Sequence, residues 1–241
     1  MSYSNGFFTK NIYPDGRNTE GGKTMRVRVK ICCISSIAEA QTAVRCGADA
    51  LGLVGAMPTG PGVVADDLIH DIIKTVPPPI AHFLLTSETT AEGIIAHLKK
   101  THANTIQIVD DTVSPAVRKA VRAAMPMVKI VQVIHVLTDK TVDEALLAAE
   151  TADILLLDSG NPAARELGGT GRIHNWDLSR RIVEQSPVPV FLAGGLGAAN
   201  VRAAIEYVQP FGVDLCSSVR TEGGLDERKL TLFFEKIRQQ F

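Results

Sequence analysis

Residues Val27-Arg28-Val29-Lys30-Ile31-Cys32 combine β-branched and charged side chains and end in a thiol. Such a run predicts a short buried strand. The stretch that follows it, Ile37 to Cys46, has the apolar spacing of an amphipathic helix. In a parallel sheet, a helix of this kind covers the strand before it. The segment therefore predicts one β/α unit of an α/β fold.

The same unit recurs eight times along the chain. The expected strands are Val27 to Cys33, Ala50 to Val54, Ile80 to Leu85, Thr105 to Val109, Lys129 to Val136, Ile154 to Asp158, Val188 to Ala193 and Val213 to Ser217. The expected helices are Ile37 to Cys46, Asp66 to Val76, Ala91 to Thr101, Pro115 to Ala124, Asp143 to Glu150, Asn175 to Gln185, Ala199 to Val208 and Asp226 to Gln240. Eight such units favour a single closed (β/α)8 TIM barrel. An open doubly wound sheet is the alternative, because periodicity alone does not show closure.

Residues 26–241 are long enough for one barrel domain, since such domains commonly run to about 250 residues. Residues 1–25 are polar, rich in Gly, Asn and Thr, and without periodicity. They predict a disordered extension, with Met25 as an alternative start. Within the barrel, Ser35 or Ser36 is expected to cap the first helix, Gly47 to end it, and Asn200 to cap the seventh.

The charge balance points to a small-molecule partner. The chain has 25 basic and 26 acidic residues and a formal charge of -1, so no global field attracts nucleic acid or an anionic membrane. No apolar run reaches the roughly 18 residues that span a bilayer. The spacing of Cys32, Cys33, Cys46 and Cys216 fits neither a CxxC pattern nor a zinc site. We therefore expect a soluble, cytoplasmic protein with reduced thiols.

Two groups capable of proton transfer stand where predicted strands end. Cys32 closes the first strand and Asp158 closes the sixth. The C-terminal ends of barrel strands carry the catalytic residues, so the pair suggests acid/base chemistry. Each residue also has a structural interpretation, because a cysteine is often a small buried hydrophobe and an aspartate at a strand end often caps a helix.

Three glycine-rich stretches follow predicted strands in the second half: residues 168–171, 193–197 and 216–219. Glycine lets backbone amides approach a phosphate, and barrels often bind phosphate after strands seven and eight. The stretches predict a phosphate site, although a tight turn is the alternative for any one of them. Neither a GxGxxG motif nor a Walker loop occurs in a strand-to-helix context, so no nucleotide cofactor is expected.

The histidines do not cluster in the sequence, and no metal site is expected. His97 and His102 are expected to face solvent, on or after a helix. His135, near the end of the fifth strand, has two interpretations, as a pocket residue or as a hydrogen-bonded structural histidine, of which the second is commoner. His82 and His174 stand apart from the others.

These segments together resemble phosphoribosylanthranilate isomerase, a (β/α)8 enzyme family of tryptophan biosynthesis. The resemblance runs from Val27 to the C-terminus in the same order. It is carried by Val29-Lys30-Ile31-Cys32, Gly47-Ala48-Asp49-Ala50-Leu51-Gly52, Leu155-Leu156-Leu157-Asp158, Gly168-Gly169-Thr170-Gly171, Ala193-Gly194-Gly195-Leu196 with Asn200-Val201, Pro210-Phe211-Gly212-Val213-Asp214, and Ser217-Ser218-Val219.

The resemblance implies an Amadori rearrangement of a small phosphorylated sugar-amine. Asp158 would be the acid that protonates the furanose ring oxygen, and Cys32 the base that removes the C2′ proton. The acid must hold a proton at neutral pH, whereas the thiol must ionise readily. The phosphate would be held by the backbone of Gly194, Gly195, Ser217 and Ser218, and further substrate contacts are expected from Lys30, Gly169, Arg172 and Arg220.

Three departures from the family pattern lie on the expected catalytic rim. The family's Ser-Pro-Arg segment, whose arginine is expected to bind the anthranilate carboxylate, is replaced by Met57-Pro58-Thr59-Gly60-Pro61-Gly62-Val63-Val64. Its Gln-Leu-His-Gly segment is replaced by Gln107-Ile108-Val109-Asp110-Asp111. Cys33 stands where the family has glycine and is expected either to pack outward or to crowd the turn. Arg172 and Arg220 are the candidates to replace the missing cation, and the alternatives for each are a solvated loop residue or a second phosphate ligand.

These departures leave alternatives open. One is a divergent isomerase with another aglycone, and another is a barrel that binds a phosphorylated sugar without catalysis. An aldolase or epimerase is disfavoured, because Schiff-base chemistry needs a lysine at a strand's C-terminal end, whereas Lys30 and Lys129 lie earlier in their strands. The sequence predicts either a monomer or a homodimer.

Overall fold

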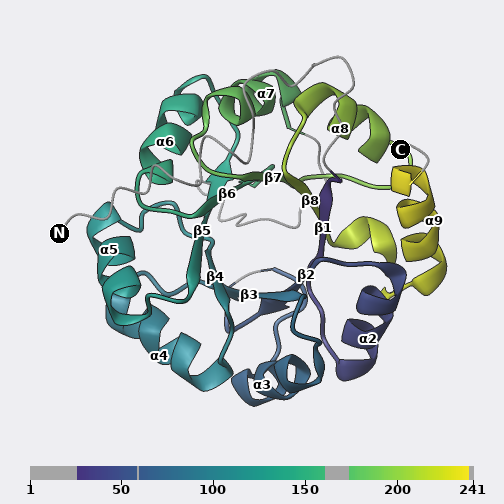
Figure 1. Cartoon of the computed structure of the whole chain (residues 1–241), viewed down its shortest axis with the longest axis horizontal. Coiled ribbons are helices and arrows are strands. Elements are labelled where there is room, and N and C mark those ends of the chain that lie inside the picture. Colours follow the sequence, from purple (N-terminus) through teal and green to yellow (C-terminus); the bar gives the residue numbers. More distant parts are fainter. Residues whose placement is uncertain (1–25, 59, 161–173, 239–241) are drawn as a thin grey trace.

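Eight parallel strands close into a barrel in the order of the chain, each hydrogen-bonded to the next and β8 to β1 (Figure 1). The computed structural model describes residues 26–58, 60–160 and 174–238. The strands are β1 (Arg28–Ile31), β2 (Ala50–Val54), β3 (Ala81–Thr86), β4 (Thr105–Ile108), β5 (Lys129–His135), β6 (Ile154–Asp158), β7 (Val190–Leu192) and β8 (Gly212–Leu215). This closure confirms the (β/α)8 barrel and excludes the open sheet.

The helices form a ring outside the strands (Figure 1). They are α2 (Ile37–Cys46), α3 (Asp66–Thr75), α4 (Ala91–Thr101), α5 (Pro115–Ala124), α6 (Lys140–Ala149), α7 (Trp176–Gln185), α8 (Val201–Val208) and α9 (Glu227–Arg238). Among the described residues, no helix is long and apolar enough to cross a membrane. The disordered extension expected at residues 1–25 lies outside the described residues.

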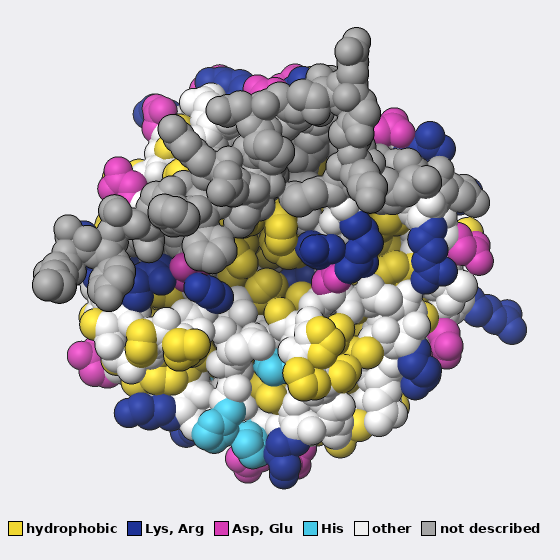
Figure 2. All heavy atoms as spheres, viewed as in Figure 1, with side chains coloured by type: hydrophobic (Ala, Val, Ile, Leu, Met, Phe, Trp, Pro, Cys, Tyr) yellow, Lys and Arg dark blue, Asp and Glu magenta, His cyan; other side chains and the backbone are white. Residues whose placement is uncertain are grey.

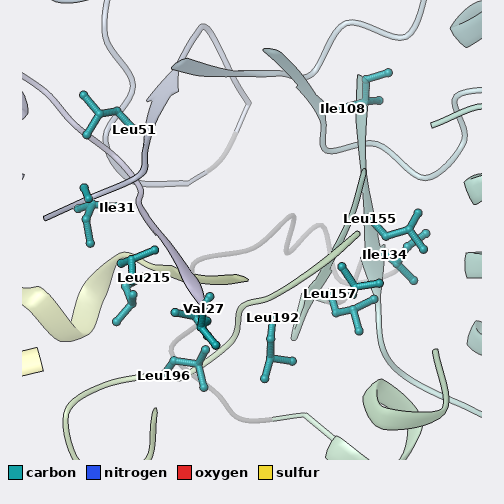
Figure 3. Packing of buried hydrophobic residues seen from close by; sticks show 14 of the residues in the cluster. Val27, Ile31, Leu51, Ile108, Ile134, Leu155, Leu157, Leu192, Leu196 and Leu215 are labelled. Atoms are coloured by element: carbon teal, nitrogen blue, oxygen red, sulfur yellow. The ribbon is translucent and has the colours of Figure 1, made fainter. Parts of the chain in front are cut away.

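Alternation along each strand divides the apolar side chains between two layers. One set, which includes Ile31, Leu51, Leu155 and Leu192, packs between the strands and the helices (Figure 3). The other set fills the barrel: Cys32, Cys33, Ala50, Val54, Phe83, Leu85, Val109, Val131, Val133, Leu156, Phe191 and Ala193. Because neighbours in a strand face opposite sides, Cys32 points inward when Ile31 points outward. The outer layer holds the helices on, and the inner layer forms the floor beneath the site.

The first helix begins and ends as its sequence predicts. The hydroxyl of Ser36 accepts a hydrogen bond from the Glu39 amide (3.2 Å), and the Glu39 carboxylate accepts one from the Ser35 amide (2.9 Å). Gly47 ends the helix with φ 116, and its amide bonds back to the carbonyl of Ala43. This reciprocal cap explains why the predicted bounds of α2 are correct.

The chain after Leu215 differs from the expectation. The last barrel strand ends at Leu215 rather than Ser217, and a short 3₁₀ turn (Ser217–Val219) follows it. A hairpin of two-residue strands, β9 (Arg220–Thr221) and β10 (Gly224–Leu225), then leads to α9. The sequence analysis missed this hairpin because two residues are too few to show an alternating pattern.

His97 does not face solvent as expected. Its side chain is only 8% exposed, and it lies between α4 and the strands. One ring nitrogen is 3.0 Å from the Thr86 hydroxyl, and the other is 3.0 Å from the Asp66 carboxylate. The two partners stabilise a histidine on the inner face of α4, whereas His102, just after the helix, is exposed as expected.

Candidate active site

A cavity opens at the C-terminal ends of the barrel strands, the end that carries the active site in enzymes of this fold. It contains about 790 Å³ of empty space, part of which is open to bulk solvent. Cys32, Asp158, Gly194, Gly195 and Ser217 all line it. Figure 2 looks down the barrel and shows the hollow with hydrophobic side chains in it. The structure thus places the two proposed catalytic groups in one cavity.

Lys30 lies beneath this cavity and not on its wall. Its side chain is fully buried, and Nζ donates a 2.8 Å hydrogen bond to Oδ2 of Asp214. The two residues are paired in the β1–β8 register. Although burial alone would lower the pKa of Lys30, the charges of Asp214 and Cys32 raise it above its ordinary value. Lys30 therefore stays cationic and is positioned to act on Cys32 rather than as an exposed substrate ligand.

Asp214 is the part of this pair that the sequence analysis missed. It is 8% exposed, and burial raises its pKa above the ordinary carboxyl range, with the Lys30 ammonium opposing the rise. One of its oxygens, Oδ1, has no hydrogen-bond partner among the described residues. A buried charge pair of this kind is costly to break, because either partner alone would remain desolvated.

Gly52 makes room for the reactive end of β1. A Cβ added at this position would lie 2.7 Å from Sγ of Cys32 and 3.0 Å from Nζ of Lys30. No larger residue fits there without moving one of these groups. The backbone of β2 therefore closes one side of the small space in which the Lys30 ammonium acts on the Cys32 sulfur.

The electrostatics of Cys32 suit a base. Its hydrogen bond with Cys33, aided by the charge of Lys30, lowers the thiol pKa to about 7, although burial acts in the opposite direction. A thiol with this pKa is substantially ionised at neutral pH, and the thiolate is the form that accepts a proton. Cys32 is 6% exposed and lines the cavity. The expectation of a thiol that ionises readily agrees with these surroundings.

Cys33 neither packs outward nor crowds the turn. It belongs to the apolar set inside the barrel, with 5% of its surface exposed and φ 63. A Cβ on Gly62 would come within 2.5 Å of the Cβ of Cys33, so the glycine in the loop after β2 accommodates it. Hydrogen bonds with Cys216 and Cys32, together with burial, raise the pKa of Cys33. Its thiol therefore stays protonated and can donate to a neighbouring thiolate.

Asp158 reaches the cavity from the end of β6. Its Oδ1 accepts a hydrogen bond from the Ser159 amide (2.7 Å). His135 is its partner in the β5–β6 register. Both ring nitrogens of His135 lack a hydrogen-bond partner among the described residues, so the hydrogen-bonded structural histidine considered above is not found.

A second histidine, His174, is close enough to Asp158 for the charge of Asp158 to affect its pKa. Nε2 of His174 is 2.6 Å from the hydroxyl of Ser179. Burial lowers the pKa of His174 to about 4, and the charge of Asp158 partly opposes this. His174 is therefore neutral at neutral pH. It lies far from Asp158 in the sequence, which is why the sequence analysis did not connect them.

The loop after β7 has the backbone needed to bind a phosphate. Gly194 and Gly195 both have positive φ, 80 and 62. Asn200 was expected to cap α8, but its side chain makes no capping bond. Instead, its amide donates to the Gly195 carbonyl (2.9 Å) and its oxygen accepts from the Gly197 amide (2.8 Å). This side chain thus stabilises the shape of the glycine loop.

The turn after β8 lies against the same loop. Ser217 lines the cavity, whereas Ser218 does not. A Cβ on Gly197 would come within 3.1 Å of the Cβ of Ser218, so Ser218 packs on the glycine loop. Gly169 and Arg172 lie outside the described residues.

Arg220 does not line the cavity. Its guanidinium forms a part-buried ion pair with Glu39 (3.1 Å) and donates to the carbonyls of Cys32 (3.2 Å) and Cys33 (2.5 Å). It also donates to the carbonyl of Gly223 (2.8 Å). These contacts connect the end of β1 to the β9–β10 hairpin and leave Arg220 poorly placed to replace the missing cation.

The acids after β4 are also not part of the cavity wall. Val109 lines the cavity, but Asp110 and Asp111 do not. Asp110 instead accepts hydrogen bonds from the amide and hydroxyl of Thr112 (2.8 and 2.5 Å). Within the described ranges, no group of three or more His, Cys, Asp and Glu residues is arranged to hold a metal ion.

Comparison with known proteins agrees with this geometry. Residues 29–236 match the family model described as N-(5'-phosphoribosyl)anthranilate (PRA) isomerase. The isomerase of Methanosarcina acetivorans is 35% identical over 227 residues, covering 89% of this chain and 94% of that protein. The solved phosphoribosyl anthranilate isomerase of Thermococcus kodakaraensis superposes with a TM-score of 0.74 at 27% identity, covering 88% of this chain and 99% of that one. The chain belongs to the phosphoribosylanthranilate isomerase family.

Proposed function

We propose that this chain converts N-(5-phosphoribosyl)anthranilate into 1-(o-carboxyphenylamino)-1-deoxyribulose 5-phosphate, a step of tryptophan biosynthesis. The observation that carries the proposal is that Cys32 and Asp158, from the ends of β1 and β6, line the same cavity. An aldose-to-ketose rearrangement needs one group that gives a proton and one that takes a proton, and the cavity supplies both.

The reaction begins at the furanose ring oxygen. Asp158 gives a proton to this oxygen, and the bond from the oxygen to C1′ breaks. The nitrogen lone pair then forms a double bond to C1′, which makes the C2′ proton acidic. The Cys32 thiolate removes this proton, and the resulting enol-amine tautomerises to the ketose. Lys30 stabilises the thiolate before the transfer, and its hydrogen bond with Asp214 holds the ammonium in place.

The sugar phosphate is assigned to the loops after β7 and β8. Gly194, Gly195 and Ser217 line the cavity there. Two consecutive residues with positive φ let backbone amides converge on an anion. Ser218 contributes by packing on Gly197 rather than from the cavity wall. A solved relative at 24% identity contains the reduced form of 1-(o-carboxyphenylamino)-1-deoxyribulose 5-phosphate, which bears a phosphate of this kind.

The aglycone end of the cavity lacks a cation in the described part of the chain. None of the lining residues there is lysine or arginine. Losing a charge-assisted bond to a carboxylate costs about 1.5 to 3 kcal/mol. If Arg172, which stands outside the described residues, does not supply that bond, we expect KM for the anthranilate substrate to be roughly tenfold or more above that of relatives with the Ser-Pro-Arg arginine.

The test is conversion of freshly generated phosphoribosylanthranilate by the purified, reduced protein, followed by the loss of anthranilate fluorescence. The wild-type protein is expected to turn over, and Asp158→Asn to lose about 10²- to 10⁴-fold in kcat, because a carboxamide is far too weak an acid to transfer a proton to the ring oxygen. Full activity of Asp158→Asn would exclude the acid assignment. Binding of the ketose phosphate without turnover would instead favour the non-catalytic barrel.

The assembly state and location belong to the same proposal. The solved relative from Thermotoga maritima is described as a dimeric protein. We propose a monomer or a homodimer that acts in the cytoplasm. Light scattering during size-exclusion chromatography distinguishes the two assembly states, and a higher oligomer would contradict both.

A further inference from the structure

Three thiols meet at the seam where β1 and β8 close the barrel. Cys32 and Cys33 follow β1, and Cys216 follows β8. The Cys32 amide donates to the Leu215 carbonyl (2.7 Å), which fixes the two strand ends side by side. The Sγ atoms of Cys33 and Cys216 lie 2.9 Å apart. The proposed reaction uses only Cys32 as a proton acceptor, and Cys33 and Cys216 do not react in it.

We propose that Cys33 and Cys216 form an oxidisable pair that a hydroperoxide converts into a disulfide, and that this bond switches off Cys32. A disulfide has an S–S length of about 2.05 Å, so the two sulfur atoms need to approach by less than 1 Å. No strand has to move to another register, because the two residues already flank the same pair of hydrogen-bonded strands.

The surroundings hold Cys33 in place for this reaction. Its φ of 63 is uncommon for a residue other than glycine. The Arg220 guanidinium binds the carbonyls of both Cys32 and Cys33, and Gly62 packs against the Cys33 side chain. These contacts fix the backbone conformation that directs the Cys33 sulfur toward Cys216.

Cys216 is the sulfur that reacts first. It is half-buried and lines the cavity, whereas Cys33 is almost fully buried. The single proton of Cys33 can be donated to Cys32 or to Cys216 but not to both. When it is donated to Cys216, this hydrogen bond and the nearby charge of Arg220 lower the pKa of Cys216, against the effect of burial. An accessible thiol beside a cation is the kind that peroxides oxidise, and a neighbouring thiol then resolves the product.

Oxidation of the two thiols to the disulfide takes two steps. The Cys216 thiolate attacks the terminal oxygen of the hydroperoxide, the O–O bond breaks, and the alkoxide leaves as an alcohol after taking up a proton. Cys216 is then a sulfenic acid. The Cys33 sulfur attacks the Cys216 sulfur, the S–O bond breaks, and the hydroxyl leaves as water with the proton of Cys33. Two thiols have lost two electrons and two protons, and the peroxide has been reduced to alcohol and water.

The disulfide lowers turnover because it raises the pKa of Cys32. The Cys33 thiol is the largest favourable influence on ionisation of Cys32, and a disulfide sulfur has no proton to donate. The pKa of Cys32 then rises from about 7 toward the ordinary value of 9.0, which lowers the thiolate fraction near pH 7 roughly tenfold or more. This effect rests on the proposed role of Cys32 as the base, whereas formation of the disulfide does not.

The experiment exposes the reduced protein to cumene hydroperoxide, blocks the remaining thiols, and maps tryptic peptides by mass spectrometry without reduction. The expected product links residues 31–45 to residues 203–220, with a mass loss of two hydrogen atoms. The first peptide contains both Cys32 and Cys33. The link must therefore persist in Cys32→Ser and be absent from Cys33→Gly and Cys216→Ser. Cys46→Ser, which removes a thiol elsewhere, is the matched control and retains the link.

Turnover is measured on the same samples. Activity is expected to fall at least tenfold as the link forms and to return with dithiothreitol. A link that persists in Cys33→Gly, or peroxide that oxidises Cys46 while Cys33 and Cys216 stay reduced, overturns the proposal. If the disulfide forms without any change in turnover, the claim that it switches off Cys32 is wrong. A link that forms in a protein with no isomerase activity before oxidation supports the thiol pair and contradicts the proposed function instead.

Discussion

At the scale of single residues, the site depends on which of four buried groups, Cys32, Cys33, Lys30 and Asp214, carry protons. Cys32 ionises easily because Cys33 donates to it and Lys30 is charged beneath it. Lys30 keeps its charge because Asp214 is its partner. The position that holds glycine in the family pattern here holds a thiol that tunes the base, so Cys33 is a positioning residue.

The pH dependence of kcat/KM tests this arrangement. The base works as a thiolate, so the acidic limb of the profile is expected to rise with pH through about 7. Because the reaction also needs an acid, the rate is expected to fall again at higher pH. In Cys33→Gly the hydrogen-bond donor is gone, and the inflection is expected to move upward by about one unit or more. The glycine suits the positive φ, so folding is retained. An unchanged inflection would show that Cys33 does not act on the base.

Gly52 is the second test at this scale. Gly52→Ala places a methyl group 2.7 Å from the Cys32 sulfur, and it is expected to reduce kcat at least tenfold and to destabilise the fold by about 1 to 3 kcal/mol. Gly224→Ala is the matched control, because its methyl group would meet its nearest atom at 3.7 Å. Equal activity of the two variants in the fluorescence assay would contradict the close approach of residue 52 to the Cys32 sulfur.

At the scale of elements, the loops after β7 and β8 set the shape of the phosphate site. Asn200→Ala removes both side-chain bonds that hold the glycine loop, at 2.9 and 2.8 Å. We expect KM for the phosphorylated substrate to rise roughly tenfold, with a smaller effect on kcat. Asn104→Ala is the control, since Asn104 bonds the start of β3 at the far end of the barrel. A KM that rises equally in both variants would exclude a specific role for the loop.

The β9–β10 hairpin depends on the Arg220–Glu39 pair, whose side chains are 9% and 13% exposed. Arg220→Ala is expected to lower the free energy of unfolding by about 3 to 5 kcal/mol, as measured with urea. Arg180→Ala, which removes a surface pair with Glu184, is expected to cost less than about 1 kcal/mol. Equal losses in the two variants would show that the buried pair contributes no more than an exposed one.

The same pair predicts how stability depends on pH. Against the effect of burial, hydrogen bonds from Arg220 lower the pKa of Glu39. A carboxyl whose pKa is depressed on folding stabilises the fold above its unfolded pKa and loses this effect as pH falls through its folded pKa. The difference between wild type and Arg220→Ala should therefore shrink below about pH 4. A difference that stays constant on acidification would contradict this.

At the scale of the whole molecule, much of the fold was predictable from local pattern. The bounds of α2, α4 and α5 match the predicted ranges, because apolar spacing and caps agree there. Cys32 and Asp158 were predictable as rim residues, since strand ends meet at one side of a barrel. The contacts of Asp214 and Cys216 with the end of β1 were not predictable, because they depend on the register between β8 and β1, the two strands that close the barrel. The burial of His97 was also missed, because its two partners, Thr86 and Asp66, lie on other elements.

The central claim is that Cys32 is the base of an isomerase. The most direct measurement is kcat/KM for phosphoribosylanthranilate with Cys32→Ser and Cys46→Ser, both fully reduced. Cys46→Ser is expected to keep wild-type turnover, because Cys46 lies at the end of α2 and does not line the cavity. Cys32→Ser is expected to lose about 10²- to 10⁴-fold, because a serine hydroxyl does not ionise near neutral pH. Cys32→Ser turnover within a few-fold of Cys46→Ser would contradict the account.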